Sequence, residues 1–181
     1  MKRMVPVLFA AVCCLTLSSP AQPVSPELAQ QARASVEKGL AWLKAHQKPS
    51  GAWSEENMPA LTALPLWAIA ASGSTAFGPE QDKAVACLLS KQKPDGGIYV
   101  PQPDKKGSGL GNYNTSISAM ALEATGRKDL APAILKARTY IASSQHFGDD
   151  SHAGGFGYDK DSQRAYTDLN NTHYSMDAMR R

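Results

Sequence analysis

Three glutamines end three similar segments of this chain, and their recurrence constrains the fold more than any other feature. Gln47, Gln92 and Gln145 stand 45 and 53 residues apart, and a lysine lies nine residues before each of them, at positions 38, 83 and 136. Glycine follows each glutamine in a turn-forming segment, at Gly51, at Gly96 and, more loosely, at Gly155. A helix end that recurs with its turn is typical of a chain built from stacked structural repeats.

A second register runs through the segments that follow these turns. When Thr62, Thr115 and Thr172 are aligned, an alanine lies six residues after each of them, at positions 68, 121 and 178. Two registers that hold at once favour an internal repeat over chance. We interpret the three threonines as hydroxyls at helix starts rather than as catalysts.

The apolar pattern of each repeat predicts two helices of different character. The first helix has apolar residues at steps of three and four, as a helix with one buried face does. The second helix of the first repeat, over 60–72, has almost no polar face, as a buried helix does, and 114–125 is likewise small and apolar. We predict helices over 28–47, 60–72, 80–92, 114–125, 130–145 and 171–181, with Gly73 and Gly126 as stop signals. The fold is therefore predicted to be all-α, with repeats at about 28–73, 80–126 and 130–181.

The N-terminal segment has the pattern of an export signal. Lys2 and Arg3 precede an apolar run from Val5 to Leu17, and small residues then mark a cleavage site near Ala21. We expect a signal peptide over 1–21, a proline-rich tether over 22–27 and a repeat domain over 28–181. The run is too short to cross a bilayer, so we expect no transmembrane span after signal removal and a periplasmic or extracellular location.

The composition of the chain without its signal argues against nucleic acid as a partner and against an internal disulfide. Residues 22–181 hold 17 basic and 16 acidic residues, a balance that gives nucleic acid no basic surface to bind. Cys87 is the only cysteine left, so an internal disulfide is excluded and packing must stabilise the fold.

The motifs that end the outer-type helices resemble the prenyltransferase and squalene-oxidase repeat. The resemblance is carried by Gln-x-x-x-Gly-x-Trp at Gln47, Gly51 and Trp53, by its relative at Gln92 and Gly96, and by Gly-Gly-Phe-Gly-Tyr at 154–158. The chain is thus similar to the terpenoid cyclases and the β-subunits of protein prenyltransferases. The resemblance implies an α/α toroid of inner and outer helices, a structural role for the motif glutamines, and an apolar or isoprenoid small molecule as ligand.

The catalytic signatures of that family are missing from these residues. No Asp-x-Asp-Asp acid is present, and Asp149-Asp150 is interpreted as a solvated loop pair. The zinc site of the transferases needs Asp, Cys and His, whereas only a His-bearing segment at 171–174 is faintly similar. We therefore expect no metal, no cofactor and no complete active site, and the site residues of catalysis stay unknown.

If a ligand binds, we expect it at the entrances of the inner helices and at the third loop. The candidates are aromatic, acidic or imidazole side chains: Tyr113, Tyr158, Tyr166, Asp168, His173 and Tyr174. The alternative interpretation is structural, with Tyr158 and Tyr174 in the core and Asp168 as a helix cap.

Three functional hypotheses follow. The first is an exported binding or structural scaffold. The second is a fragment of an isoprenoid-acting enzyme, a cyclase or a prenyltransferase, with catalytic residues further downstream, and the third is an exported carbohydrate-acting protein. Three helix pairs are about half of the toroid that the resemblance implies. We therefore expect either a truncated N-terminal part of a longer protein, which is the favoured explanation, or self-association of two copies.

Overall fold

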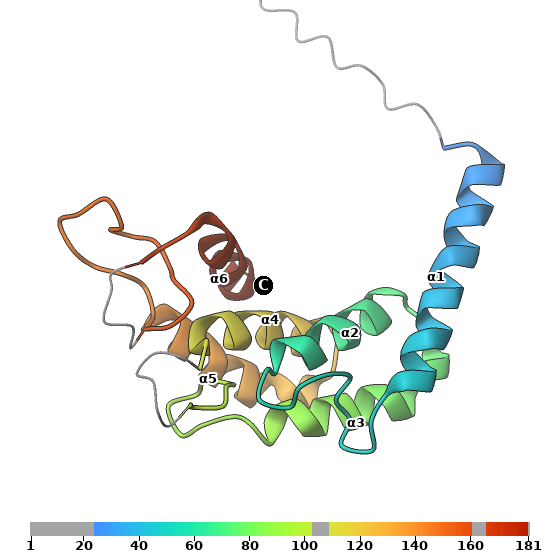
Figure 1. Ribbon diagram of the computed structural model, residues 1–181, viewed down its shortest axis with the longest axis horizontal. Coiled ribbons are helices and arrows are strands. Elements are labelled where there is room, and N and C mark those ends of the chain that lie inside the picture. Colours follow the sequence, from blue (N-terminus) through green and yellow to red (C-terminus); the bar gives the residue numbers. More distant parts are fainter. Residues whose placement is uncertain (1–23, 103–108, 161–165, 181) are drawn as a thin grey trace, which may run out of the picture. The chain divides into compact units, whose positions relative to one another are not determined.

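The computed structural model describes residues 24–102, 109–160 and 166–180, and in these residues the chain is all-helical (Figure 1). The expected signal peptide and the first two residues of the expected tether lie outside this part. The helices are α1 (Pro26–His46), α2 (Ala60–Ala71), α3 (Gly78–Leu89), α4 (Gly111–Ala124), α5 (Ala131–Ala142) and α6 (Leu169–Arg180). Short 3-10 turns at Thr75–Phe77 and Lys128–Leu130 precede α3 and α5. The all-α prediction is confirmed.

The chain divides within α1 into an N-terminal unit and a compact unit that spans Val36–Arg181. In the N-terminal unit, the described residues form the start of α1, where the Ser25 hydroxyl accepts a hydrogen bond from the Leu28 N–H at 3.2 Å. That contact satisfies one of the amide donors that every helix start leaves unpaired.

The helices α2, α4 and α6 form the inner series, and α4 packs against both of the others. Eleven of the 14 residues of α4 are buried, which is what a helix between two neighbours requires. The largest buried apolar side chains of the inner series are Leu66, Ile69, Ile117, Met120 and Leu122. The core of the compact unit therefore lies along α4.

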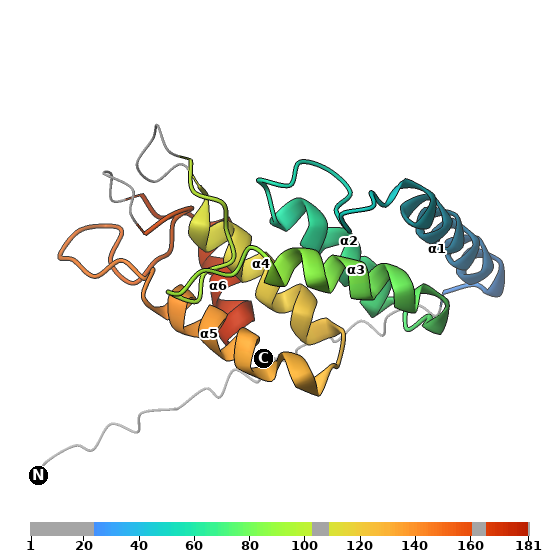
Figure 2. The same cartoon turned by 90° about the horizontal axis from the view of Figure 1, so that it is seen from below.

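The helices α3 and α5 form the outer series, with α3 against α2 and α5 against α4 (Figure 2). Each buries one face only, for example Val85 and Leu88 on α3 and Ile134 and Ile141 on α5. Their opposite faces are exposed, as the steps of three and four in the sequence predict.

Local hydrogen bonds set the helix ends, and they correct one interpretation. Gly73 and Gly126 both have φ of 67° two residues beyond α2 and α4, so their predicted role as stop signals is confirmed. Thr115, however, is the fifth residue of α4 rather than its cap. Its hydroxyl accepts the Ile98 N–H at 2.9 Å, and Thr172 likewise accepts the Phe156 N–H at 3.1 Å. These threonines fasten the preceding loop to the inner helix.

Candidate functional site

The motif glutamines join each turn to the next outer helix. The side-chain amide of Gln47 donates to the Gly51 carbonyl at 3.1 Å and to the Glu80 carbonyl, at the start of α3, at 2.9 Å. Gln92 repeats this pattern in the second turn, with the Gly96 carbonyl at 3.1 Å and the carbonyl of Ala133 on α5 at 2.9 Å. One amide therefore links its own turn to the first turn of the following helix.

The motif glycines bring the same turns against the backbone of the next outer helix. Gly51 and Gly96 are buried and have φ of 88° and 93°. A Cβ atom at Gly51 would lie 2.2 Å from the carbonyl oxygen of Lys83, and one at Gly96 would lie 2.2 Å from that of Lys136. Both the left-handed backbone and the close approach require glycine.

The third turn differs from the other two. The Gln145 amide donates to the carbonyl of Gly154 at 2.8 Å, and Gly154 has φ of 82°. By hydrogen bond and by backbone conformation, the counterpart of Gly51 and Gly96 is thus Gly154 and not Gly155, which the sequence alignment selects. Gly154 follows its glutamine by nine residues, whereas Gly51 and Gly96 follow theirs by four, so this turn is longer than the other two. Gly154 is exposed, and no atom of another described residue lies within 4 Å of the position of its Cβ.

Three of the candidate ligand residues form one aromatic cluster, which we call the tyrosine cluster: Tyr113, Tyr158 and Tyr174. Tyr113 on α4 lies between the other two, with ring centroids 5.7 Å from Tyr158 and 6.2 Å from Tyr174. Burial raises the pKa of the Tyr113 phenol, and the neighbouring Tyr174 and Tyr158 raise it further. The cluster is partly open, because Tyr158 is 40% exposed.

The other candidates take different positions. The Asp168 carboxylate accepts the Asn171 backbone N–H at 2.9 Å and the Asn171 side-chain amide at 2.6 Å, so it holds the start of α6. His173 lies beside Tyr174, with ring centroids 5.9 Å apart, and its Nε2 is 3.9 Å from Asp177. The ring of Tyr166 is exposed, and none of the ring contacts found among the described residues includes it.

A buried polar network lies beneath the tyrosine cluster, and the sequence interpretation missed it. The Asn112 amide donates to the Gly157 carbonyl at 2.7 Å and to the Ser175 hydroxyl at 3.0 Å, and Ser175 lies 3.2 Å from Ser116. All three side chains are fully buried. The available signal was the four-residue step from Asn112 to Ser116, which places both on one helix face. The network fixes the loop that carries Tyr158 against α4 and α6.

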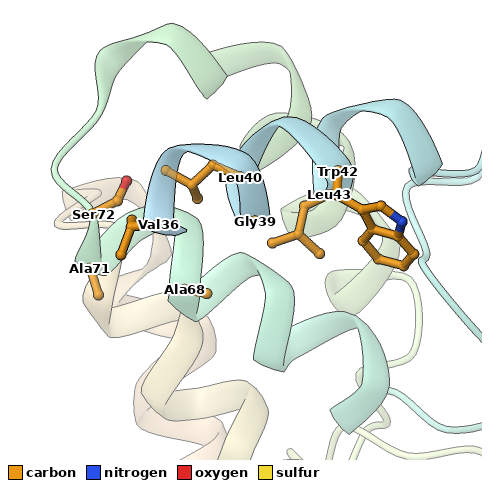
Figure 3. Close-up of a pocket in the computed structure, with 8 residues that line it drawn as sticks. All are labelled: Val36, Gly39, Leu40, Trp42, Leu43, Ala68, Ala71 and Ser72. Atoms are coloured by element: carbon orange, nitrogen blue, oxygen red, sulfur yellow. The ribbon is translucent and has the colours of Figure 1, made fainter. Parts of the chain in front are cut away.

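An apolar groove lies between α1 and α2, with a volume of about 670 Å³ (Figure 3). The residues that line it within the compact unit are Val36, Gly39, Leu40, Trp42, Leu43, Ala68, Ala71 and Ser72. Val36 and Trp42 are 55% and 57% exposed, which is unusual for large apolar side chains of an amphipathic helix. The prediction of α1 as an ordinary outer helix gave no indication of this groove.

Metal binding and thiol reactivity would depend on the His, Cys, Asp and Glu side chains of the described residues. No three side chains of His, Cys, Asp or Glu in this part of the chain lie close enough together to hold a metal ion. Cys87 is buried on α3, and burial raises the pKa of its thiol. None of the described helices is both long and apolar enough to cross a membrane.

Comparison with known proteins returned no match among family models, curated proteins or solved structures.

Proposed function

We propose that this chain is an exported, non-catalytic binding scaffold of the helical-pair repeat type, related in architecture to the α/α toroids. The observation that carries this proposal is that polar side chains near the starts of the inner helices form hydrogen bonds within the fold. Asn114 accepts the first N–H of α2 from Ala60, Thr115 holds Ile98, and Asp168 holds the start of α6. Each of these groups has a hydrogen-bond partner within the fold, which supports a structural role for it.

We further propose that the tyrosine cluster binds the ligand. Partly exposed aromatic rings offer flat apolar faces with a polar edge, and the buried network below holds these rings in place. An apolar ligand such as an isoprenoid fits this surface. The exposed rings of Tyr158 and Tyr166 favour a sugar as the second candidate, because pyranose rings also stack on aromatic faces.

The test is a pair of alanine variants measured by titration calorimetry. Farnesol serves as the isoprenoid probe, and a set of soluble oligosaccharides serves as the sugar probe. Tyr158→Ala should weaken binding about fivefold, because an aromatic contact contributes about 1 kcal/mol beyond its buried area. Phe147→Ala is the matched control, since Phe147 lies in the same loop and is 78% exposed.

The two probes distinguish the isoprenoid proposal from the sugar proposal. Binding of farnesol alone supports the isoprenoid proposal, and binding of a saccharide alone supports the sugar proposal. If neither probe binds, or if both variants bind like the parent chain, the tyrosine cluster is not the ligand site. Turnover of either probe would overturn the proposal of a non-catalytic scaffold.

A further inference from the structure

The two end members of the inner series lack a neighbour that the middle member has. α4 buries eleven residues, whereas α2 buries five and α6 buries three. All three helices belong to one repeat register, so equivalent positions can be compared directly. The position four residues after the aligned threonine is fully buried on α2 and α4, at Leu66 and Ala119, yet Met176 at this position on α6 is 59% exposed.

On the opposite face of the inner helices, the exposed end member is α2 instead of α6. The positions two and six residues after the threonine are buried on α4, at Ile117 and Ala121. On α2 these positions are Leu64, which is 40% exposed, and Ala68, which is also exposed. Positions four and six after the threonine lie about 160° apart around a helix at about 100° per residue. One face of an inner helix therefore contacts the next member of the series, and the other face contacts the previous member.

The turns show the same asymmetry along the outer series. The first and second turns bring a glycine against the carbonyl of Lys83 on α3 and of Lys136 on α5. The third turn has the equivalent glycine, Gly154, and no described residue comes close to the position where the next carbonyl would lie. The Gln145 amide has one acceptor among the described residues, where Gln47 and Gln92 each have two. The third turn is thus one half of an interface that the chain already forms twice.

The other half of that interface is exposed on α1. Lys38 occupies the same register position as Lys83 and Lys136, nine residues before the motif glutamine. Lys38 and Gly39 are exposed, and no side chain lies near the Gly39 Cβ position. Beside them, the groove between α1 and α2 presents Ala68, which lies on the open face of the inner series.

We propose that these two surfaces bind each other between copies of this chain, in a head-to-tail arrangement. In this assembly the turn at Gly154 of one copy contacts the Lys38 carbonyl of the next, and Met176 packs against Leu64 and Ala68. A second copy of the chain fits both surfaces, because each surface lacks the partner that the other provides. The contact between copies would repeat the contacts that the chain itself forms at Gly51 and Gly96. This arrangement joins unlike surfaces, so it gives a closed ring or a continuing row.

The first test of this assembly adds a single methyl group at position 154. Gly154→Ala adds a Cβ that should overlap the incoming carbonyl, as a Cβ at Gly96 would overlap Lys136. Gly126→Ala is the matched control, since Gly126 also has a positive φ and no described atom within 4 Å of its Cβ position, and it belongs to neither surface. Light scattering on the chain expressed from its full sequence should give at least twice the mass of one copy for the parent and for Gly126→Ala. Gly154→Ala should be monomeric.

The second test is a mixing experiment that identifies the unlike surfaces. Met176→Arg blocks one surface and Ala68→Arg the other, and both residues are exposed, so circular dichroism should show folded proteins. Each variant alone should be monomeric. A mixture should form a one-to-one complex, because one variant supplies an intact groove and the other an intact α6 face.

Several outcomes would overturn the proposal. A parent chain that stays monomeric at all soluble concentrations excludes self-assembly, and further repeats of a longer chain would then be the occupant of these surfaces. A dimer that survives Gly154→Ala, or a mixture that fails to form the complex, indicates a contact between like surfaces elsewhere. The proposal does not rest on ligand binding, so Tyr158→Ala should assemble like the parent.

Discussion

The close contact between the second turn and α5 predicts that Gly96→Ala is strongly destabilising. The new Cβ would lie 2.2 Å from the carbonyl oxygen and 2.8 Å from the carbonyl carbon of Lys136. Both atoms belong to a regular helix, so a side-chain rotation cannot relieve the overlap, and the turn must move away from α5. Such a movement also lengthens the hydrogen bond from Gln92 to the Ala133 carbonyl on α5.

The expected loss has two parts. A left-handed backbone costs an alanine about 1–2 kcal/mol, and forcing an extra carbon into a packed site costs about 1–3 kcal/mol. The total of about 2–5 kcal/mol is a large fraction of the 5–15 kcal/mol that typically stabilises a domain. Gly126→Ala isolates the first part, because Gly126 has φ of 67° and no atom within 4 Å of its Cβ position.

Thermal and urea unfolding, followed by far-ultraviolet circular dichroism, measure the difference between these two variants. Gly96→Ala should be less stable than Gly126→Ala by about 1–3 kcal/mol, and its Tm should be lower by roughly 2–12 °C. Equal losses would show that the backbone conformation alone requires glycine, and the argument from close approach would then be wrong. Gly51→Ala should behave like Gly96→Ala, since it faces Lys83 at the same distance.

Three further predictions concern single side chains. Gln92→Ala should destabilise the chain by about 1–3 kcal/mol in urea unfolding, because two carbonyls lose their donor, whereas Gln145→Ala should have an effect close to zero at its single exposed bond. Asp168→Ala removes the cap of α6 and should cost about 1 kcal/mol, and an unchanged urea midpoint would contradict that role. Burial raises the pKa of Cys87 above its ordinary 9.0, so the folded state keeps the thiol protonated where the unfolded state ionises. Stability should therefore fall as pH rises above about 9, and Cys87→Ala should reduce that fall.

The order and character of the helices could be predicted because both depend on the spacing of apolar residues. The six helices lie within a few residues of the expected ranges. Their ends were less predictable, since they depend on contacts that are distant in sequence. α4, for example, begins at Gly111 instead of Asn114, where the Tyr158 carbonyl accepts the Asn112 and Tyr113 N–H groups from a loop more than 40 residues away.

The candidate site was predicted only in part, for a similar reason. Aromatic residues near the inner-helix starts were expected to gather, and Tyr113, Tyr158 and Tyr174 do lie together. The buried pair Asn112 and Ser175 was missed because small polar residues in an apolar helix give no sign of a partner 63 residues away. Hydrogen-bond pairing between distant segments is a property of the fold and leaves no local pattern.

The way in which each turn meets the next helix has a consequence for how such chains change over evolutionary time. Gly51 and Gly96 contact a backbone carbonyl, and the residues that supply it, Lys83 and Lys136, are exposed. Every residue type supplies the same carbonyl, so substitutions on the outer helices leave this contact intact. Repeats joined in this way are interchangeable parts: a middle unit can be duplicated, deleted or exchanged, provided that the glutamine and the glycine of each turn are kept.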